Sequence, residues 1–124
     1  MFTILLIATA LGVGAGIITG IIPGVHINLV SVLLVTVAPL LLSYTSILPL
    51  GVFIIAMAVT HTFLDVIPGV FLGAPDADAI EGVLPGHRLL MRGHAYDAVK
   101  LTVIGSLLCL LLSVALIPIL VFGI

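Results

Sequence analysis

The chain has 124 residues, of which 63% are hydrophobic and only 6% are charged. Soluble domains carry about 25% charged residues, so this chain lacks the polar surface that a soluble fold needs. Its formal net charge of −2, with three Lys and Arg residues in all, excludes a basic nucleic-acid-binding surface, and its single cysteine excludes an intrachain disulfide. We therefore expect an integral membrane protein in contact with a lipid bilayer.

Four apolar segments follow one another along the chain, at residues 2–22, 25–42, 47–64 and 98–122, and a more polar hairpin or loop occupies residues 65–97. A helix of about 20 residues crosses a hydrocarbon core of about 30 Å. These segments predict an all-α, polytopic transmembrane helix bundle that forms one domain over residues 1–124. The Lys and Arg residues all lie between the end of the third segment and the first turn of the fourth, which predicts that this region faces the cytoplasm. They are Arg88, Arg92 and Lys100.

Gly12, Gly16 and Gly20 recur every four residues in the first segment. Such a stripe of small residues lets another helix backbone approach closely. Two interpretations follow: the stripe packs two helices together, or it forms one wall of a substrate path.

Pro23-Gly24 interrupts the apolar run, and His26 and Asn28 follow directly. Broken helices inside membranes expose helix ends that can hold ions, and secondary transporters build their sites in this way. A proline kink whose polar side chains are satisfied by neighbouring helices is the alternative. A similar sequence, "VIPGVFLG", ends the third apolar run. It is either a chance similarity in a chain of biased composition or a sign that two helices are interrupted in the same manner.

His61 and Asp65 lie four residues apart, so on a helix they share one face. Ionisable side chains within a membrane span are costly and usually face a cavity or a partner. The pair predicts either a proton or cation relay or a capped helix end near the membrane surface.

The segment "DVIPGVFLGAPDADAIEGVLPGHRLL", residues 65–90, combines acidic residues with an apolar interior and Pro-Gly pairs at 68–69 and 85–86. We expect helix breaks at these two pairs and a re-entrant hairpin between them. Asp76 or Asp78 is predicted to cap a helix that runs toward Val83.

No Ser-His-Asp, Cys-His or phosphate-loop arrangement is present, and no set of ligands has the spacing of a metal site. We therefore expect no enzyme activity, no catalytic residue, no bound metal and no cofactor. An intramembrane hydrolase would need a nucleophile that the sequence does not identify.

Two stretches together resemble the large permease subunit of the tripartite tricarboxylate transporters, and within that family the branch found mainly in archaea. They are "GIITGIIPGVHINLVSVLLVTVAPLL" and "HTFLDVIPGVFLGAPDADAIEGVLPGHRLLMRGHAYDAVKLTVIGSLL". The residues that match the family pattern are Gly16, Gly20, Pro23, Gly24, Gly73, Pro75, Asp76, Asp78, Pro85, Gly86, His87, Arg88, Gly93, Ala98, Gly105 and Ser106.

The resemblance implies a secondary carrier for carboxylates in the plasma membrane, driven by an ion gradient. In bacterial relatives an extracytoplasmic solute-binding protein and a small membrane subunit are partners. Family members are several times longer and contain a second, related half. This implies that the chain is either a half-repeat that pairs with another copy or with a complementary permease half, or else a fragment of a longer permease.

We expect the substrate path to be lined by Pro23, Gly24, His26, Asn28, Gly73, Pro75 and Asp76, and ion or proton coupling to involve His61 and Asp65. Asp78 and Glu81 are expected to have structural roles. The alternative function is a membrane scaffold or assembly subunit that does not itself transport. Lipid flipping or intramembrane catalysis are further alternatives.

Overall fold

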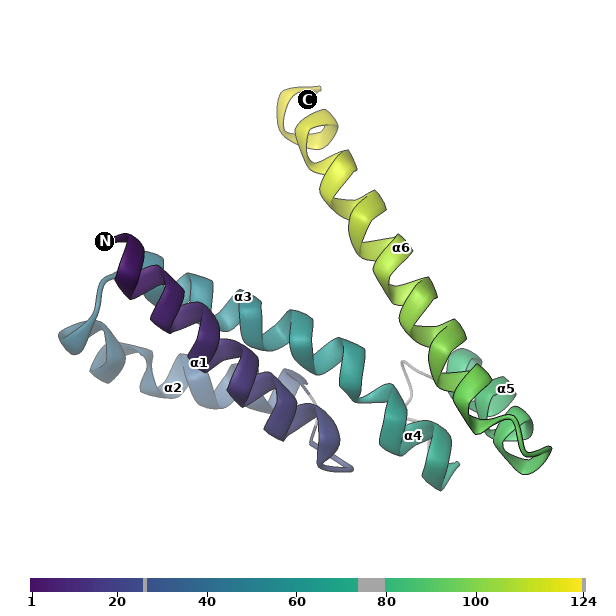
Figure 1. Cartoon of the computed structure of the whole chain (residues 1–124). Coiled ribbons are helices and arrows are strands. Elements are labelled where there is room, and N and C mark those ends of the chain that lie inside the picture. The colour runs from purple at the N-terminus through teal and green to yellow at the C-terminus, as the bar shows by residue number, and fades with distance from the viewer. Residues whose placement is uncertain (26, 74–79, 124) are drawn as a thin grey trace. The chain divides into compact units, whose positions relative to one another are not determined.

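The computed structural model describes residues 1–25, 27–73 and 80–123. Within these residues the chain forms helices and no strands (Figure 1). The helices are α1 (Phe2–Ile21), α2 (Ile27–Tyr44), α3 (Ile47–Leu64), α4 (Val66–Leu72), α5 (Ile80–Met91) and α6 (Ala95–Phe122). Four stretches of the described chain are long and apolar enough to cross a membrane, namely Phe2–Ile21, Ile27–Tyr44, Ile47–Leu72 and Ala95–Phe122. The all-α transmembrane fold expected from the sequence is confirmed.

The chain divides into two compact units. Unit 1, Met1–Gly69, contains α1, α2, α3 and the first residues of α4. Unit 2, Val70–Ile124, contains the last residues of α4 together with α5 and α6.

The main packing contact of unit 1 joins α1 and α3, which run alongside each other (Figure 1). Gly12, Gly16 and Gly20 are all buried in this contact. A Cβ atom built on Gly12 would lie 2.5 Å from the carbonyl oxygen of Phe53, and one built on Gly16 would lie 2.5 Å from that of Met57. The two backbones are therefore in direct contact. The glycine stripe packs α1 onto α3, which agrees with the first of the two interpretations, that it packs two helices together.

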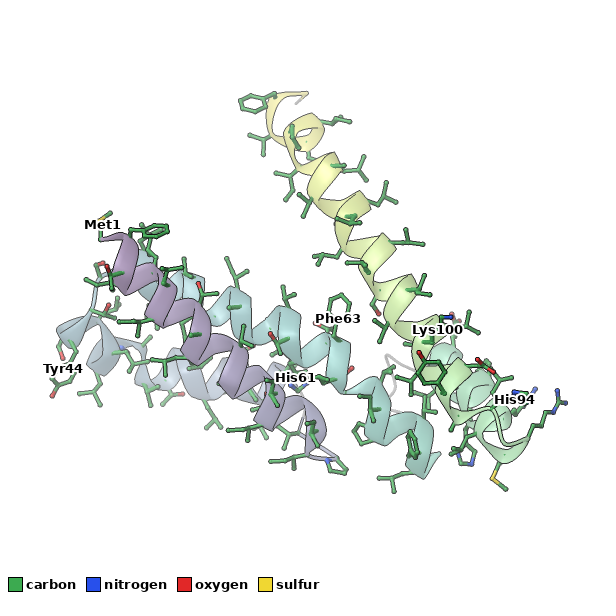
Figure 2. All side chains as sticks on the ribbon, viewed as in Figure 1. Met1, Tyr44, His61, Phe63, His94 and Lys100 are labelled. Carbon is green, nitrogen blue, oxygen red and sulfur yellow. The ribbon has the colours of Figure 1, made fainter. Side chains whose placement is uncertain are left out.

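Most side chains of α2 and α6 are exposed. No described side chain of α2 is buried, and Ala98 is the buried residue of α6. Their apolar side chains extend away from the helix axes (Figure 2). In a membrane protein such faces contact lipid or another polypeptide.

The Pro-Gly pairs differ in their effect on the helices. Pro23-Gly24 separates α1 from α2, and Gly24 has a φ of +82°, a conformation that favours glycine. Helix breaks were also expected at 68–69 and 85–86, but those expectations are wrong because α4 and α5 continue through both pairs.

Pro68 lies in the first turn of α4, where a backbone N–H has no partner within the helix and its loss costs little. The interruption lies instead at Asp65, between α3 and α4, where the Asp65 N–H still donates to the His61 carbonyl at 2.9 Å. Pro85 lies inside α5 and removes one hydrogen bond from that helix.

The close contact predicts unequal effects of two alanine substitutions on α1. Gly16→Ala should destabilise the chain by about 1–3 kcal/mol, because the added methyl group meets the backbone of α3. Gly14→Ala should be neutral or stabilising by up to about 1 kcal/mol, because a Cβ at Gly14 meets nothing within 4 Å and alanine favours the helix. Thermal unfolding of the two variants in detergent micelles measures the difference. Equal melting temperatures would contradict the packing described here.

Candidate functional site

His61 is the most deeply buried polar side chain of the described chain, with 1% of its surface exposed. It lies on α3, one turn before the helix ends at Leu64. The glycine stripe brings α1 onto the backbone of His61. A Cβ atom on Gly16 would lie 3.1 Å from the backbone nitrogen of His61, and one on Gly20 would lie 2.9 Å from its carbonyl oxygen. The imidazole is therefore enclosed by the contact between the two helices.

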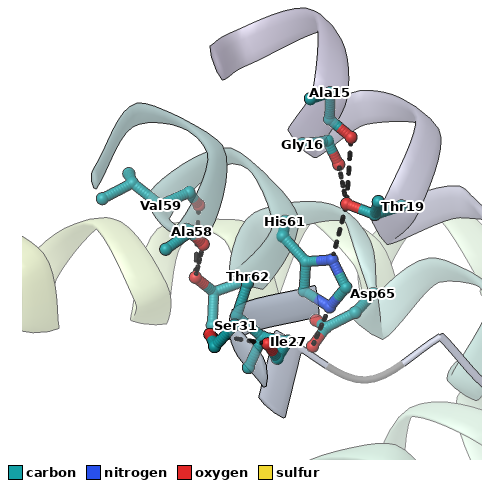
Figure 3. Close-up of polar contacts among 10 residues, drawn as sticks. All are labelled: Ala15, Gly16, Thr19, Ile27, Ser31, Ala58, Val59, His61, Thr62 and Asp65. Atoms are coloured by element: carbon teal, nitrogen blue, oxygen red, sulfur yellow. Dashed lines mark hydrogen bonds and ion pairs between the residues drawn. The ribbon is translucent and has the colours of Figure 1, made fainter. Parts of the chain in front are cut away.

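Figure 3 shows the polar contacts of this ring. The Nδ1 atom lies 3.0 Å from the hydroxyl oxygen of Thr19 on α1. The Thr19 hydroxyl donates to the carbonyl oxygen of Ala15 at 2.9 Å and lies 3.4 Å from that of Gly16. On the other side of the ring, Nε2 lies 4.0 Å from Oδ2 of Asp65. We refer to Thr19, His61 and Asp65 as the His61 cluster.

The members of the His61 cluster differ in exposure. The His61 side chain is 2% exposed and the Asp65 side chain is 37% exposed. A distance of 4.0 Å is longer than a hydrogen bond but within the range of an ion pair. The cluster therefore leads from a buried imidazole to a carboxyl group that reaches the surface of unit 1.

The spacing of His61 and Asp65 predicted their shared face, and the structure places their side chains together. Thr19 was missed, because it is 42 residues from His61 and a hydroxyl in an apolar helix usually bonds to its own backbone. The available signal was its position directly beside Gly20, on the stripe that packs against α3.

The interruption between α1 and α2 holds several of the other predicted residues. Pro23 and Gly24 are exposed, and the N–H of Val25 donates to the carbonyl oxygen of Ile22 at 3.3 Å. Asn28 lies in the first turn of α2 with an exposed side chain. The predicted residue His26 lies outside the described residues. The first turn of α2 also appears in the close-up of the His61 cluster, with Ile27 and Ser31 (Figure 3).

In unit 2, His87 joins α5 to the end of α4. Its Nδ1 atom lies 2.7 Å from the carbonyl oxygen of Val70, which belongs to the last turn of α4. Carbonyl groups in the last turn of a helix lack a partner within the helix, and His87 supplies one. Since a carbonyl oxygen only accepts hydrogen bonds, Nδ1 carries the hydrogen.

Small residues make room for this bond. Gly73 ends α4 with a φ of +64°, and a Cβ there would lie 2.8 Å from Nε2 of His87. A Cβ on Gly86 would lie 2.9 Å from a methyl group of Val70. The predicted site residues Pro75 and Asp76, and the predicted capping residue Asp78, lie outside the described residues.

Unit 1 also contains a hollow of about 500 Å³ at the N-terminal half of α1. It is lined by side chains from three helices, α1, α2 and α3, and almost all of them are apolar. None of the predicted site residues lines it, and it offers no charged group to a carboxylate. The described residues bring no three His, Cys, Asp or Glu side chains together.

Comparison with known proteins gives one family and one curated relative. A family model described as the tripartite tricarboxylate transporter TctA family matches residues 6–124. The uncharacterized protein MJ1079 of Methanocaldococcus jannaschii is 36% identical over 104 residues, which are 84% of this chain and 25% of that protein. The chain thus spans about a quarter of the length of this curated relative. No solved structure matches the chain significantly.

The hydrogen bond between His87 and Val70 predicts that removing the His87 ring loosens α5 from α4 and makes buried residues of α5 more accessible. Val83 is 1% exposed, so a cysteine introduced as Val83→Cys in a Cys109→Ser background should react slowly with a water-soluble maleimide. Adding His87→Ala should speed this reaction about tenfold, because a hydrogen bond worth about 1–1.5 kcal/mol is lost.

His94→Ala is the matched control, because the exposed His94 ring bonds Asp97 within the first turn of α6. Leu84→Cys, at a position that is 43% exposed, gives the rate for an accessible thiol. If His87→Ala and His94→Ala change the labelling rate of Val83→Cys equally, His87 does not hold α4 and α5 together.

Proposed function

Because the chain belongs to the tripartite tricarboxylate transporter TctA family, we propose that it is a half-unit of a membrane permease that moves carboxylates across the plasma membrane. The observation that carries this proposal is the His61 cluster, an enclosed imidazole paired with a carboxyl group between two helices that are otherwise apolar. Ionisable groups in such a position are costly and are found mostly where ions or protons pass.

We assign substrate binding to the region around the start of α2, with Pro23, Gly24, His26 and Asn28, and separately, in unit 2, to Gly73, Pro75 and Asp76. The first N–H groups of an 18-residue helix have no partner within the helix, and the helix dipole adds positive potential there. The exposed amide of Asn28 supplies a further donor. Donors of this kind suit a carboxylate, which only accepts hydrogen bonds.

The substrate path is proposed to be completed by another polypeptide. Transporter sites usually lie between two related repeats. The exposed faces of α2 and α6 provide surfaces for a second copy or for a complementary permease half. An extracytoplasmic solute-binding protein is a further proposed partner, as the family resemblance implies.

A second candidate function is a membrane scaffold or assembly subunit of a larger permease. The extent of the exposed helix faces favours it, since an assembly subunit must cover apolar surface on its partner. Crosslinking through Cys109, which is exposed on α6, combined with native mass spectrometry separates the two functions. A stable complex with a longer permease supports the scaffold, whereas an oligomer of this chain alone supports the carrier.

The carrier proposal predicts that the reconstituted chain takes up di- and tricarboxylates into proteoliposomes. Asn28→Ala should raise the substrate concentration for half-maximal uptake about tenfold or more, because a hydrogen bond to a charged group is worth about 1.5–3 kcal/mol. Its melting temperature should not change, since the Asn28 side chain is exposed.

Ser31→Ala is the matched control on α2, because the Ser31 hydroxyl donates to the carbonyl oxygen of Ile27 at 2.8 Å. Its uptake should equal that of the unaltered chain. The proposal is abandoned if no carboxylate is taken up, and the assignment of Asn28 is abandoned if both variants behave alike.

A further inference from the structure

The hydrogen of the Thr19 hydroxyl points toward α1 itself. The Thr19 oxygen lies 2.9 Å from the carbonyl oxygen of Ala15 and 3.4 Å from that of Gly16. Neither carbonyl can supply a hydrogen, so both are acceptors for the single hydroxyl hydrogen. The lone pairs of the Thr19 oxygen are then directed toward the remaining neighbour, the imidazole of His61.

This direction fixes the tautomer of His61. With the Thr19 hydrogen on the carbonyl oxygen of Ala15, the Nδ1 atom, 3.0 Å from the Thr19 oxygen, is the donor of this bond and carries a hydrogen. In the neutral ring the other nitrogen, Nε2, is then without hydrogen. Thr19 thus reserves Nε2 as the basic position of the ring.

Nε2 faces the carboxyl group of Asp65 at 4.0 Å. If the ring is neutral and the carboxyl group ionised, two groups that only accept hydrogens face each other, which is unfavourable beside an imidazole that is only 2% exposed. One added proton removes the conflict. It either forms an Nε2–H bond and an imidazolium beside the carboxylate, or it neutralises the carboxyl group, which can then donate toward Nε2.

The surroundings favour a proton over a metal cation as the occupant. Hard cations such as those of the alkaline earths are held by several oxygen ligands, whereas here one of the two facing groups is a ring nitrogen. Among the described residues α1 and α4 carry no titratable side chain, and α2 carries only Tyr44 at its far end. His26, which precedes α2, lies outside the described residues.

We infer that the coupling ion of the carrier is a proton held between Nε2 of His61 and the Asp65 carboxyl group, and that Thr19 is the positioning residue that keeps Nε2 available for it. The inference rests on the proposed function and adds the identity of the ion and the role of Thr19. Asp65, the exposed member of the cluster, exchanges the proton with water, taking it up from one side of the membrane and releasing it to the other, so that each cycle leaves the side chains unchanged.

Nitrogen NMR of the chain in lipid bilayers, with ¹⁵N-labelled histidine, tests the inference without measuring transport. The His61 signals are assigned by their loss in His61→Gln. We expect Nδ1 to be protonated at every pH and all pH-dependent change to occur at Nε2. Replacing choline chloride by sodium chloride should leave the signals where they are.

Two substitutions of Thr19 separate positioning from packing. Thr19→Val keeps the shape of the side chain but removes the acceptor, so the neutral ring should move its hydrogen from Nδ1 to Nε2. Thr19→Ser keeps the hydroxyl and should keep the original tautomer. A bare Nδ1 in the unaltered chain, an unchanged tautomer in Thr19→Val, or His61 signals that follow sodium instead of pH each overturn the inference.

Uptake measurements distinguish this inference from the function on which it rests. In proteoliposomes an inward proton gradient should drive carboxylate uptake, and a sodium gradient of equal size should not. Uptake driven by sodium alone overturns the inference and leaves the carrier function standing. If no gradient drives uptake, the carrier function fails, and with it the coupling role of the proton, while the NMR result still decides the position of the proton.

Discussion

The direct contact between the backbones of α1 and α3 is the constraint on which unit 1 depends. Lipid tails are as apolar as the helices, so the two helices gain little from the hydrophobic effect and must gain from close packing. The same closeness allows the short side chain of Thr19 to reach the imidazole of His61 at 3.0 Å. Methyl groups on the stripe glycines would separate the helices and break this bond. Packing and the His61 cluster are therefore consequences of one sequence feature, the four-residue repeat of glycine.

The sequence predicted what depends on local pattern and missed what depends on tertiary contact. Long apolar runs predicted the membrane-spanning helices, and the four-residue spacing of His61 and Asp65 placed both on one face of α3. Thr19 could not be predicted as their partner, because no periodicity within α1 indicates which residue of α3 it meets. Proline was over-interpreted: Pro68 lies in the first turn of α4, where the missing N–H is tolerated, so the helix does not break there.

His61 and His87 are held in the same way but differ in what their second nitrogen meets. In each ring Nδ1 bonds an oxygen of another helix, the Thr19 hydroxyl for His61 and the Val70 carbonyl for His87. Nε2 of His87 lies against Gly73, so its ring satisfies a helix end and closes a turn. Both nitrogens of His87 thus have a structural neighbour within unit 2. Nε2 of His61 instead faces a carboxyl group, and under the proposal above it gains a bonding partner when a proton occupies the cluster.

Several exposed hydroxyl groups on the described membrane-crossing helices do not offer their hydrogens to a carboxylate. Among the exposed hydroxyl groups on these helices, those of Thr9, Ser31, Thr36 and Thr62 each donate to the carbonyl oxygen four residues earlier. The hydrogens of these hydroxyl groups are thus engaged by the helix backbone. Only the lone pairs of their oxygen atoms face outward, and these repel a carboxylate. A charged substrate cannot cross the hydrocarbon core without donors or a water-filled path. Within unit 1 the start of α2 supplies such donors, because the first N–H groups of that helix have no partner within it.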